Sequence, residues 1–467
     1  MQVKILYSIV EGITRGRAFD MIYQRLFDTV ENNKEKILEA EKYIWEHPEV
    51  GFREWNTTRY LKEHMEALGL EVHKVGDIPG FWVDMEFGGE GPRLAIFAEM
   101  DALNIPAHPD ADKETGAVHA CAHHCQCAAM VGLASALVES GVKDELCGSV
   151  RLFAVPAEET IEIDFRQGLA EQGIIHYYNG KQEYLYRGLL DGVDIAMMVH
   201  TGSKGVELNR GSNGFISKRM TFVGKASHGA SPERGLNALY AATNALGAAN
   251  AIREQFSGEK NFRFHPIITK GGGAVNVIPD EVVVESFTRG DTMKKVIAAN
   301  DKINRAFAAS AAALGCRLVI SDKHGAMPRY DDDNMIDAAY RVGRMLFPEN
   351  EVKRTEGWAA GSTDMGDISA VIPSVHAHIG AGPLPGHTST FKVIDHVSAC
   401  VTNAKLQAGI VALLFSDGAA YARKVVAEAK VAYPSIEAYF EDVEKGSFNG
   451  DAVIYNDDGT ISIKYKN

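Results

Sequence analysis

The stretch Arg93–Leu137, RLAIFAEMDALNIPAHPDADKETGAVHACAHHCQCAAMVGLASAL, contains the residues that decide how this chain folds. Its apolar start, Arg93–Glu99, predicts a buried strand, and its Ala-rich end predicts a helix. Between the two lie Asp101 and a dense group of imidazoles and thiols: His119, Cys121, His123, His124, Cys125 and Cys127. A borderline-soft divalent metal prefers thiolate and imidazole ligands. The stretch therefore predicts a metal centre where a strand leads into a helix.

Packing is the alternative explanation for this group. A buried thiol or a hydrogen-bonded histidine is common when either occurs alone. The adjacent imidazoles favour a metal centre, with Cys121 and His123 as the first candidates. His119, His124, Cys125 and Cys127 cannot all be ligands, so some must lie beside the ligands or on the surface of the helix.

Two further strands are predicted to end on side chains that can bind a metal. Ser149–Val155 is apolar and is followed by Glu158 and Glu159, and Asp194–His200 ends on a histidine. Helical stretches separate these strands, which favours an open, largely parallel α/β sheet. In such sheets, ligands bind beyond the carboxyl ends of the strands. Three strand ends with metal-binding side chains are difficult to explain by packing.

The pair Glu158-Glu159 suits hydrolysis assisted by two metal ions. Adjacent residues at a strand end point in different directions, so one carboxylate can bind metal while the other takes a proton from water. A solvated acidic turn is the alternative. His387, in the Gly/Pro-rich loop Gly380–Phe391, is a further candidate ligand. His376 and His378 alternate along a predicted strand and are assigned to packing.

A second pattern begins near Phe215. The predicted elements follow the order β-α-β-β-α-β, which is that of a ferredoxin-like unit of about 100 residues. The first pattern then resumes with predicted helices at Asn334–Leu346 and Phe391–Phe415 and a small hairpin at the end. The predicted domains are 1–213 for the first part of a catalytic domain, 214–326 for an inserted domain, and 327–467 for the second catalytic part.

Composition restricts the class of protein. The formal net charge of −14 argues against a nucleic-acid-binding surface. Three of the six cysteines lie within seven residues, which does not resemble a disulfide framework and favours a reducing cytoplasm. The first residues have too short an apolar run for a signal peptide. No apolar run approaches the ~20 residues that span a bilayer.

Motifs along almost the whole chain, from about Glu31 to Phe415, carry a family resemblance. In order they are His47-Pro48-Glu49, MDAL at Met100–Leu103, HACAH at His119–His123, PAEE at Pro156–Glu159, MMVH at Met197–His200, KASHGASPERGLNAL at Lys225–Leu239, NVIPD at Asn276–Asp280, STDMGDIS at Ser362–Ser369 and GHTSTF at Gly386–Phe391. This ordered set resembles the dinuclear-metal amidohydrolase and peptidase family of aminoacylase, carboxypeptidase G, the indole-acetyl-amino-acid hydrolases and aminobenzoyl-glutamate hydrolase. Tyr184–His200 is most similar to the aminobenzoyl-glutamate and dipeptide-cleaving branch.

The resemblance implies a zinc-exopeptidase-like three-layer catalytic domain with an inserted ferredoxin-like dimerisation domain. It implies two divalent ions per chain, zinc or manganese, with the ligands Cys121, His123, Glu159, His200 and His387. Glu158 is then the general base and acid, and Asp101 orients a ligand. His228 completes the active site of a dimeric partner and stabilises the oxyanion. Asn276 and Arg289 match positions that hold the carboxylate of the substrate.

The chain departs from the family pattern in two places. Ala122 stands where the family has glycine, and His124 replaces an acid or amide, so we assign His124 to the surroundings of the ligands. Cys125-Gln126-Cys127 also differs from the common run, and extra donors here could change the preferred metal or make the site sensitive to oxidation. The glycine that usually follows the glutamate pair is absent, and the unusual segment Ile161–Arg166 comes instead.

Together these features predict a cytoplasmic homodimer that hydrolyses the amide or peptide bond of a small N-acyl amino acid, an aminobenzoyl-glutamate-like compound or a dipeptide. Neither a nucleic acid nor a membrane is expected as a partner. One alternative is a non-catalytic dimer whose Cys/His-rich site senses a metal or an oxidant. Another is an amidase that uses Cys125 or Cys127 as the nucleophile.

Overall fold

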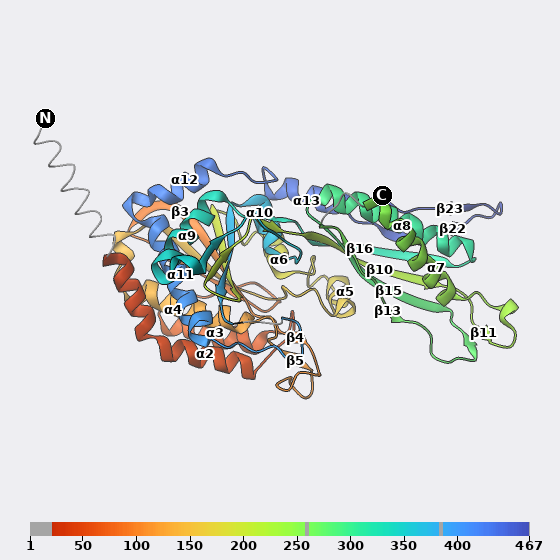
Figure 1. Ribbon diagram of the computed structural model, residues 1–467, viewed down its shortest axis with the longest axis horizontal. Helices are drawn as coiled ribbons and strands as arrows, with labels where there is room; N and C mark the ends of the chain where they lie inside the picture. The colour runs from red at the N-terminus through yellow and green to blue at the C-terminus, as the bar shows by residue number, and fades with distance from the viewer. Residues whose placement is uncertain (1–20, 257–260, 383–385, 467) are drawn as a thin grey trace, which may run out of the picture. The chain divides into compact units, whose positions relative to one another are not determined.

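The computed structural model describes residues 21–256, 261–382 and 386–466 (Figure 1). The predictions about the first 20 residues lie outside this range. The chain divides into two compact units: the first unit comprises 21–210, 330–357 and 371–432, and the second unit comprises 211–329, 358–370 and 433–466. The predicted third segment, 327–467, is therefore divided between the two units. Strand pairing explains this division, because β19 (Trp358–Ala359) pairs with β9 (Gly211–Ser212) and β21 (Asn449–Asp451) pairs with β16 (Arg317–Ala326).

The first unit is built on a mixed eight-stranded sheet. The strand order is β1-β2-β6-β3-β7-β20-β8-β18. The strands are β1 (His73–Lys74), β2 (Phe81–Glu86), β3 (Gly89–Glu99), β6 (Cys147–Val155), β7 (Ile195–Gly202), β8 (Val206–Leu208), β18 (Val352–Arg354) and β20 (Ser374–Gly380). The central strands β6, β3, β7 and β20 are parallel, whereas β1, β2 and β8 pair antiparallel with their inner neighbours. The predicted α/β sheet is confirmed, although it is mixed: β1, β2 and β8 run antiparallel to their inner neighbours, and the edge strand β18 pairs parallel with β8.

The parallel strands place the candidate residues because their carboxyl ends lie at the same edge of the sheet. β3 ends at Glu99, β6 ends three residues before Glu158, and β7 contains His200 near its end. The helical crossovers α4 (His123–Glu139), α5 (Ile163–Glu171) and α6 (Gly180–Tyr186) follow in sequence.

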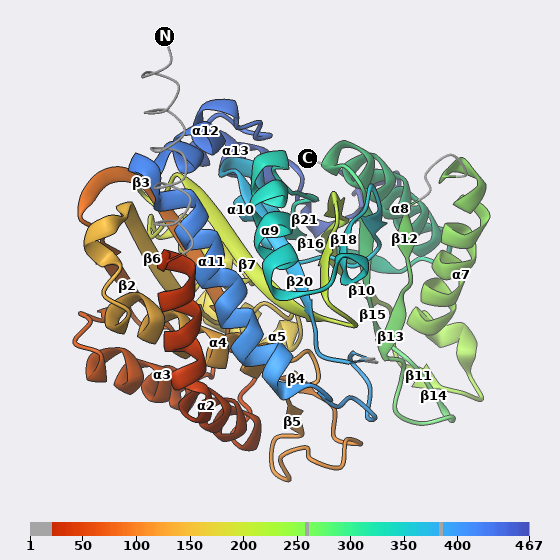
Figure 2. The same ribbon diagram turned by 60° about the vertical axis from the view of Figure 1, so that its left-hand side comes forward.

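Helix α4 is the central helix of the first unit. It is apolar on almost every side, and its residues from His123 to Leu137 are all buried. It packs against α2 (Lys34–Glu46) and α11 (Asn403–Phe415), as Figure 2 shows. A Cβ atom at Gly132 would lie 2.6 Å from Ile37 and 2.9 Å from Ala404, so glycine permits this close approach of the three helices.

The first unit contains one long apolar helical stretch. Among the described residues, Val397–Phe415 is long and apolar enough to cross a membrane by length and composition, although the sequence predicts no such run. Most of this stretch is buried. It joins a π-helix, Val397–Thr402, to α11 and packs against α4, so a core helix accounts for its composition.

The second unit has the predicted β-α-β-β-α-β order. Its elements are β10 (Gly214–Val223), α7 (Ala238–Ala251), β12 (Arg263–Phe264) with β13 (Ile267–Lys270), β15 (Glu281–Gly290), α8 (Met293–Ala313) and β16. The sheet is antiparallel, with the order β12-β15-β10-β16-β21, and β13 also pairs with β15. The small hairpin predicted at the end of the chain is present as β22 (Val453–Tyr455) and β23 (Ile461–Ile463).

Candidate metal centre

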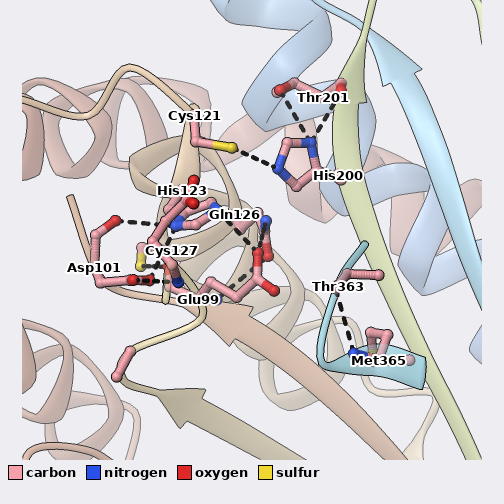
Figure 3. Close-up of polar contacts among 12 residues, drawn as sticks. Glu99, Asp101, Cys121, His123, Gln126, Cys127, His200, Thr201, Thr363 and Met365 are labelled. Atoms are coloured by element: carbon pink, nitrogen blue, oxygen red, sulfur yellow. Dashed lines mark hydrogen bonds and ion pairs between the residues drawn. The ribbon is translucent and has the colours of Figure 1, made fainter. Parts of the chain in front are cut away.

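The candidate ligands of the first unit lie together at the carboxyl edge of its sheet. The donor atoms of Cys121, His123 and His200 lie within 4.8 Å of one another. The donor atoms of Cys121, Glu159 and His387 do so as well. The two groups share Cys121, whose Sγ lies 3.5 Å from Nε2 of His200 (Figure 3). We refer to these five residues as the strand-end site.

Asp101 connects two members of the strand-end site. Its carboxylate oxygen Oδ1 lies 3.1 Å from Nδ1 of His123, and its Oδ2 accepts a 2.8 Å hydrogen bond from the backbone N–H of Glu159. The backbone carbonyl of Asp101 lies 2.9 Å from the same Nδ1. Asp101 thus fixes the ring of His123 so that Nε2 is left for a ligand, which is the orienting geometry expected of a residue behind a metal.

Glu99 is a carboxylate of this site that was absent from the predicted set. Its Oε2 lies 3.1 Å from Nε2 of His123 and accepts a 2.7 Å hydrogen bond from Gln126 (Figure 3). Its Oε1 pairs with Nζ of Lys181 at 2.5 Å, and both side chains are buried. Burial raises the pKa of Glu99, but the charges of Lys181 and the neighbouring imidazoles outweigh it and hold the pKa below its ordinary value.

A sequence signal for Glu99 exists, but none exists for Lys181. Glu99 and Asp101 are two residues apart at the end of a strand, so their side chains share a face. Lys181 lies in the polar run NGKQE, which is typical of an exposed helix start. The structure instead buries Lys181, Gln182 and Glu183 of α6.

The turns that present the ligands adopt left-handed backbone conformations. The φ angles are 63° at Ala122, 57° at Ala157 and 60° at His387. Glycine adopts such angles without a steric penalty, whereas alanine and histidine do not. Ala122 stands where the resembled sequence pattern has glycine, and it adopts an angle that glycine would adopt without strain. Strained turns of this kind gather at functional sites.

The unusual segment after Glu159 supports the carboxylate turn from behind. The buried guanidinium of Arg166 donates to the backbone carbonyls of Glu159 and Tyr178. The backbone N–H of Ala157 donates to Oε1 of Glu54 at 2.8 Å. Arg166 and Glu54, from two separate segments, therefore stabilise the turn around Glu159, although the glycine that usually follows the glutamate pair is absent.

The donor set fits divalent ions. Nε2 of His123 and Oε1 of Glu159 are buried, and within the described part of the chain they face only other candidate ligand atoms: Oε2 of Glu99 at 3.1 Å and Nε2 of His387 at 3.0 Å. Burial disfavours the imidazolium of His123, yet Glu99, Cys121 and Asp101 together raise its pKa well above the ordinary value. Burial and the carboxylate of Glu159 raise the pKa of the Cys121 thiol. A bound dication would neutralise the clustered carboxylates and would lower the pKa of the Cys121 thiol, so that the thiolate could bind the ion.

Comparison with known proteins agrees with this geometry. The model of the peptidase family M20/M25/M40 matches residues 95–411. The chain belongs to this family. The human Xaa-Arg dipeptidase is 28% identical over 81% of this chain and 85% of its own length, and the N-acetyl-L-cysteine deacetylase of Bacillus subtilis is 27% identical over 60% and 66%. The solved structure of a dinuclear metal-binding peptidase of the M20 family from Bacillus subtilis matches with a TM-score of 0.61 and 21% identity over 82% of this chain and 98% of its own.

Membership of the M20 family confirms the resemblance found in the sequence. The relatives are a dipeptidase and a deacetylase, so the chain is a hydrolase that acts on amide or peptide bonds. The non-catalytic sensor is therefore the less favoured explanation. The Bacillus subtilis peptidase is described as a dinuclear metal-binding protein, and the strand-end site of this chain offers two donor groups that share Cys121.

The structure also bears on the residues beside the ligands. The rings of His376 and His378 each lie 5.9 Å from the ring of His200. These two histidines, predicted from the sequence to serve packing, therefore lie next to a candidate ligand. Cys125 and Cys127 are fully buried, and burial raises the pKa of both thiols. An attacking thiolate must be ionised and accessible, so this environment opposes a cysteine nucleophile.

His124 points to a different set of residues from its neighbour His123. Its Nε2 lies 3.1 Å from Oε1 of Glu41 and 3.5 Å from Sγ of Cys125. These contacts join it to a cluster between α2 and α4, on the side of Glu41. Its predicted place next to the metal ligands stays a prediction.

The remaining candidates, His228, Asn276 and Arg289, belong to the second unit. His228 in β11 (Ser227–His228) faces Val277 in β14 (Val277–Ile278), and the N–H of Gly229 donates to the carbonyl of Asn276 at 2.8 Å. The structure thus places His228 and Asn276 side by side on an exposed pair of strands. Arg289 lies on β15, where its guanidinium stacks on Phe215 and Phe287. Their roles in catalysis stay predictions.

Proposed function

We propose that this hydrolase is a cytoplasmic homodimer that cleaves the amide bond of a small N-acyl amino acid or the peptide bond of a dipeptide, using two zinc or manganese ions per chain. The observation that carries the proposal is the convergence of Cys121, His123, Glu159, His200 and His387 in one unit with Glu158 beside them. The donor atoms of Glu158, His123 and Glu99 lie within 4.8 Å of one another.

The residues of the strand-end site divide the work of hydrolysis. Divalent ions held there would supply Lewis acidity and lower the pKa of water. Glu158 accepts a proton from the attacking water and returns it to the departing amine, which makes it general base and then general acid. The Asp101 carboxylate keeps the ring of His123 and the backbone of Glu159 in fixed positions.

The substrate side of the proposal rests on the second unit and on the relatives. His228 from a second copy of the chain would stabilise the developing oxyanion, and Asn276 and Arg289 would bind the carboxylate of the substrate. The relatives act on Xaa-Arg dipeptides and on N-acetyl-L-cysteine, which are small and carry a free carboxylate. Aminobenzoyl-glutamate, suggested by the resemblance of Tyr184–His200, has the same terminal group.

Replacement of Glu158 tests the proposed mechanism. Glu158→Ala should lower kcat by about 10³-fold or more on the best substrate in a panel of N-acyl amino acids, dipeptides and aminobenzoyl-glutamate. Its metal content should remain that of the wild type. Glu171→Ala, which removes an exposed carboxylate from α5, is the matched control and should retain full activity. Substantial turnover by Glu158→Ala would rule out the mechanism.

Mixed dimers test the shared active site. His228→Ala and Glu158→Ala chains should each be inactive alone. After subunit exchange, one of the two sites in a mixed dimer combines an intact Glu158 with an intact His228, so some activity should return. The absence of recovery in a sample with demonstrated exchange would remove His228 from the mechanism.

A further inference from the structure

A second group of metal-binding side chains lies within the first unit, on the side of α2. Its members are Glu41 of α2, His124 and Cys125 of α4, and His396, which directly precedes the π-helix Val397–Thr402. We call these four residues the helix-side cluster. The donor atoms of Glu41, His124 and Cys125 lie within 4.8 Å of one another, and all three residues are buried.

The distances among Glu41, His124 and Cys125 are close to the edges of a tetrahedral metal site. Bonds of about 2.0–2.1 Å to nitrogen or oxygen and about 2.3 Å to sulfur place tetrahedral ligand atoms roughly 3.3–3.6 Å apart. Nε2 of His124 lies 3.5 Å from Sγ of Cys125 and 3.1 Å from Oε1 of Glu41. Nδ1 of His396 lies 3.0 Å from the same oxygen. The contact between His124 and Cys125 already has this length, and the contact between His124 and Glu41 would need to lengthen only slightly to accommodate an ion.

Protons alone do not satisfy these contacts equally well. Nε2 of His124 can carry one proton, which serves either the carboxylate of Glu41 or the sulfur of Cys125. If Nε2 is unprotonated, it faces the carboxylate as one acceptor against another. A dication interacts favourably with all three donor atoms at once, and a carboxylate, a thiolate and an imidazole are ligands that zinc accepts together.

Two independent observations point to the same place. Nδ1 of His124 is buried without a hydrogen-bond partner in the described structure, and its ring lies 5.3 Å from the buried ring of His119. Cys400, whose thiol interacts with that of Cys125, lies within the π-helix. π-Helical turns interrupt regular helices mostly at functional positions.

We propose that the helix-side cluster binds a third divalent ion, of the zinc type, through Glu41, His124 and Cys125, while His396 holds the Glu41 carboxylate in place. The three ligand side chains are buried on two helices that pack together, which favours a structural ion over a catalytic one. The ion joins α2 to the start of α4, and His396 links Glu41 to the segment before α11. The side chain of His396 is 47% exposed, which gives the ion a route from solvent.

The third ion can be tested separately from the proposed hydrolysis because it requires no substrate. The full chain is equilibrated with excess Zn²⁺, passed through a desalting column, and analysed for zinc per chain. The wild type should retain three ions and Cys125→Ala two. Cys316→Ala, which removes a buried thiol from the second unit, is the matched control and should retain three.

Cobalt provides a second measurement that identifies the ligand. Thiolate-to-cobalt charge transfer gives near-ultraviolet absorption, and Cys121 of the strand-end site would contribute to it. In a Cys121→Ala chain loaded with Co²⁺, the absorption should persist, and in Cys121→Ala/Cys125→Ala it should disappear. Its absence from the single variant would overturn the proposal, whether or not the enzyme is active.

His396→Ala covers the case in which Cys125→Ala does not fold. Its side chain is half-exposed, so its removal should leave the fold intact while weakening the third ion. The zinc dissociation constant of that site should rise at least ~10-fold, since even the loss of an outer partner costs this much. A wild-type chain that retains two ions, both lost in Cys121→Ala, would reject the third site and leave the hydrolase proposal standing.

Discussion

The strand-end site and the helix-side cluster begin at neighbouring residues, His123 and His124, yet they differ in almost every other respect. The strand-end site draws its ligands from the ends of parallel strands and from a loop, and it contains the half-exposed His387. The helix-side cluster lies between α2 and α4 and has two members on one helix turn. Several donor residues of the first are partly exposed, as a catalytic site requires, whereas Glu41, His124 and Cys125 of the second are all buried.

The difference shows how one helix start can serve two purposes. Successive residues of an α-helix point about 100° apart, so His123 and His124 cannot face the same centre. The left-handed turn at Ala122 fixes where the helix begins and therefore which imidazole faces the strands. A sequence that looks like one crowded metal motif is thus divided between two sites.

Replacing His123 and His124 by alanine, one at a time, should give the largest difference between the two sites. His123→Ala should lower kcat/KM by about 10³-fold or more because it removes a ligand of the catalytic ions. His124→Ala should change kcat/KM by less than about tenfold, while zinc per chain falls by one ion. Steady-state kinetics and metal analysis on the same preparations check both. A comparable loss of activity in the two variants would return His124 to the strand-end site.

The buried pair Lys181–Glu99 distinguishes the strand-end site by its charge. Lys181→Met should reduce the free energy of unfolding by about 3–5 kcal/mol, because it leaves the Glu99 carboxylate buried beside His123 without its cation. Urea unfolding of the metal-free protein measures this loss. In Lys181→Met/Glu99→Gln the stranded charge is gone, so part of the stability should return. A single variant as stable as the wild type would show that the pair is energetically unimportant.

The titration of Asp101 should make the stability of the strand-end site depend on pH. Burial raises its pKa, but the hydrogen bond and charge of His123 and the N–H of Glu159 hold it at about 2, below the ordinary value of about 3.9. A depressed carboxylate pKa stabilises the fold above the unfolded pKa, and this contribution is lost as the pH falls towards 2. In the metal-free protein, the stability difference between wild type and Asp101→Asn should shrink by roughly 1 kcal/mol from pH 5 to pH 3. A difference independent of pH would contradict the assigned bonds.

The turn that separates the two sites gives the smallest effect. Ala122→Gly relieves a left-handed strain of about 1–2 kcal/mol, but it also adds about 0.4–1 kcal/mol of unfolded-state entropy and removes a buried methyl worth about 0.8 kcal/mol. The stability should therefore stay within about 1 kcal/mol of the wild type. Ala120→Gly is the control, because Ala120 is buried without a positive φ and has no strain to release. Thermal unfolding should show a clearly larger loss for Ala120→Gly.

Much of the fold was readable from the sequence because apolar runs and helix signals are local. The predicted strands Arg93–Glu99 and Ser149–Val155 correspond to β3 and β6, and the order of elements in the second unit is also as predicted. The return of residues 358–370 and 433–466 to the second unit was not readable. It depends on strand pairs between segments far apart in the chain, and two- or three-residue strands leave no periodicity.

The sequence predicts the candidate metal ligands but not the buried side chains that hold them in place. Glu158 and Glu159 follow β6, His200 lies near the end of β7, and Cys121 and His123 lie at the start of α4, so their side chains reach a common edge of the sheet. Lys181 and Arg166 lie in polar runs typical of exposed helices, and only tertiary packing buries them. The separate direction of His124 depends on a backbone angle at Ala122 that the sequence does not encode locally, because alanine rarely adopts it.

Cys121 is common to both donor groups of the strand-end site, and the residue is partly exposed. One peroxide molecule that converts this thiolate to a sulfenic acid therefore removes a ligand from both ions at once. We expect inactivation to follow single-hit kinetics and a thiol reductant with fresh metal to reverse it. The activity of this hydrolase would then depend on the redox state of the surrounding solution as well as on the supply of metal.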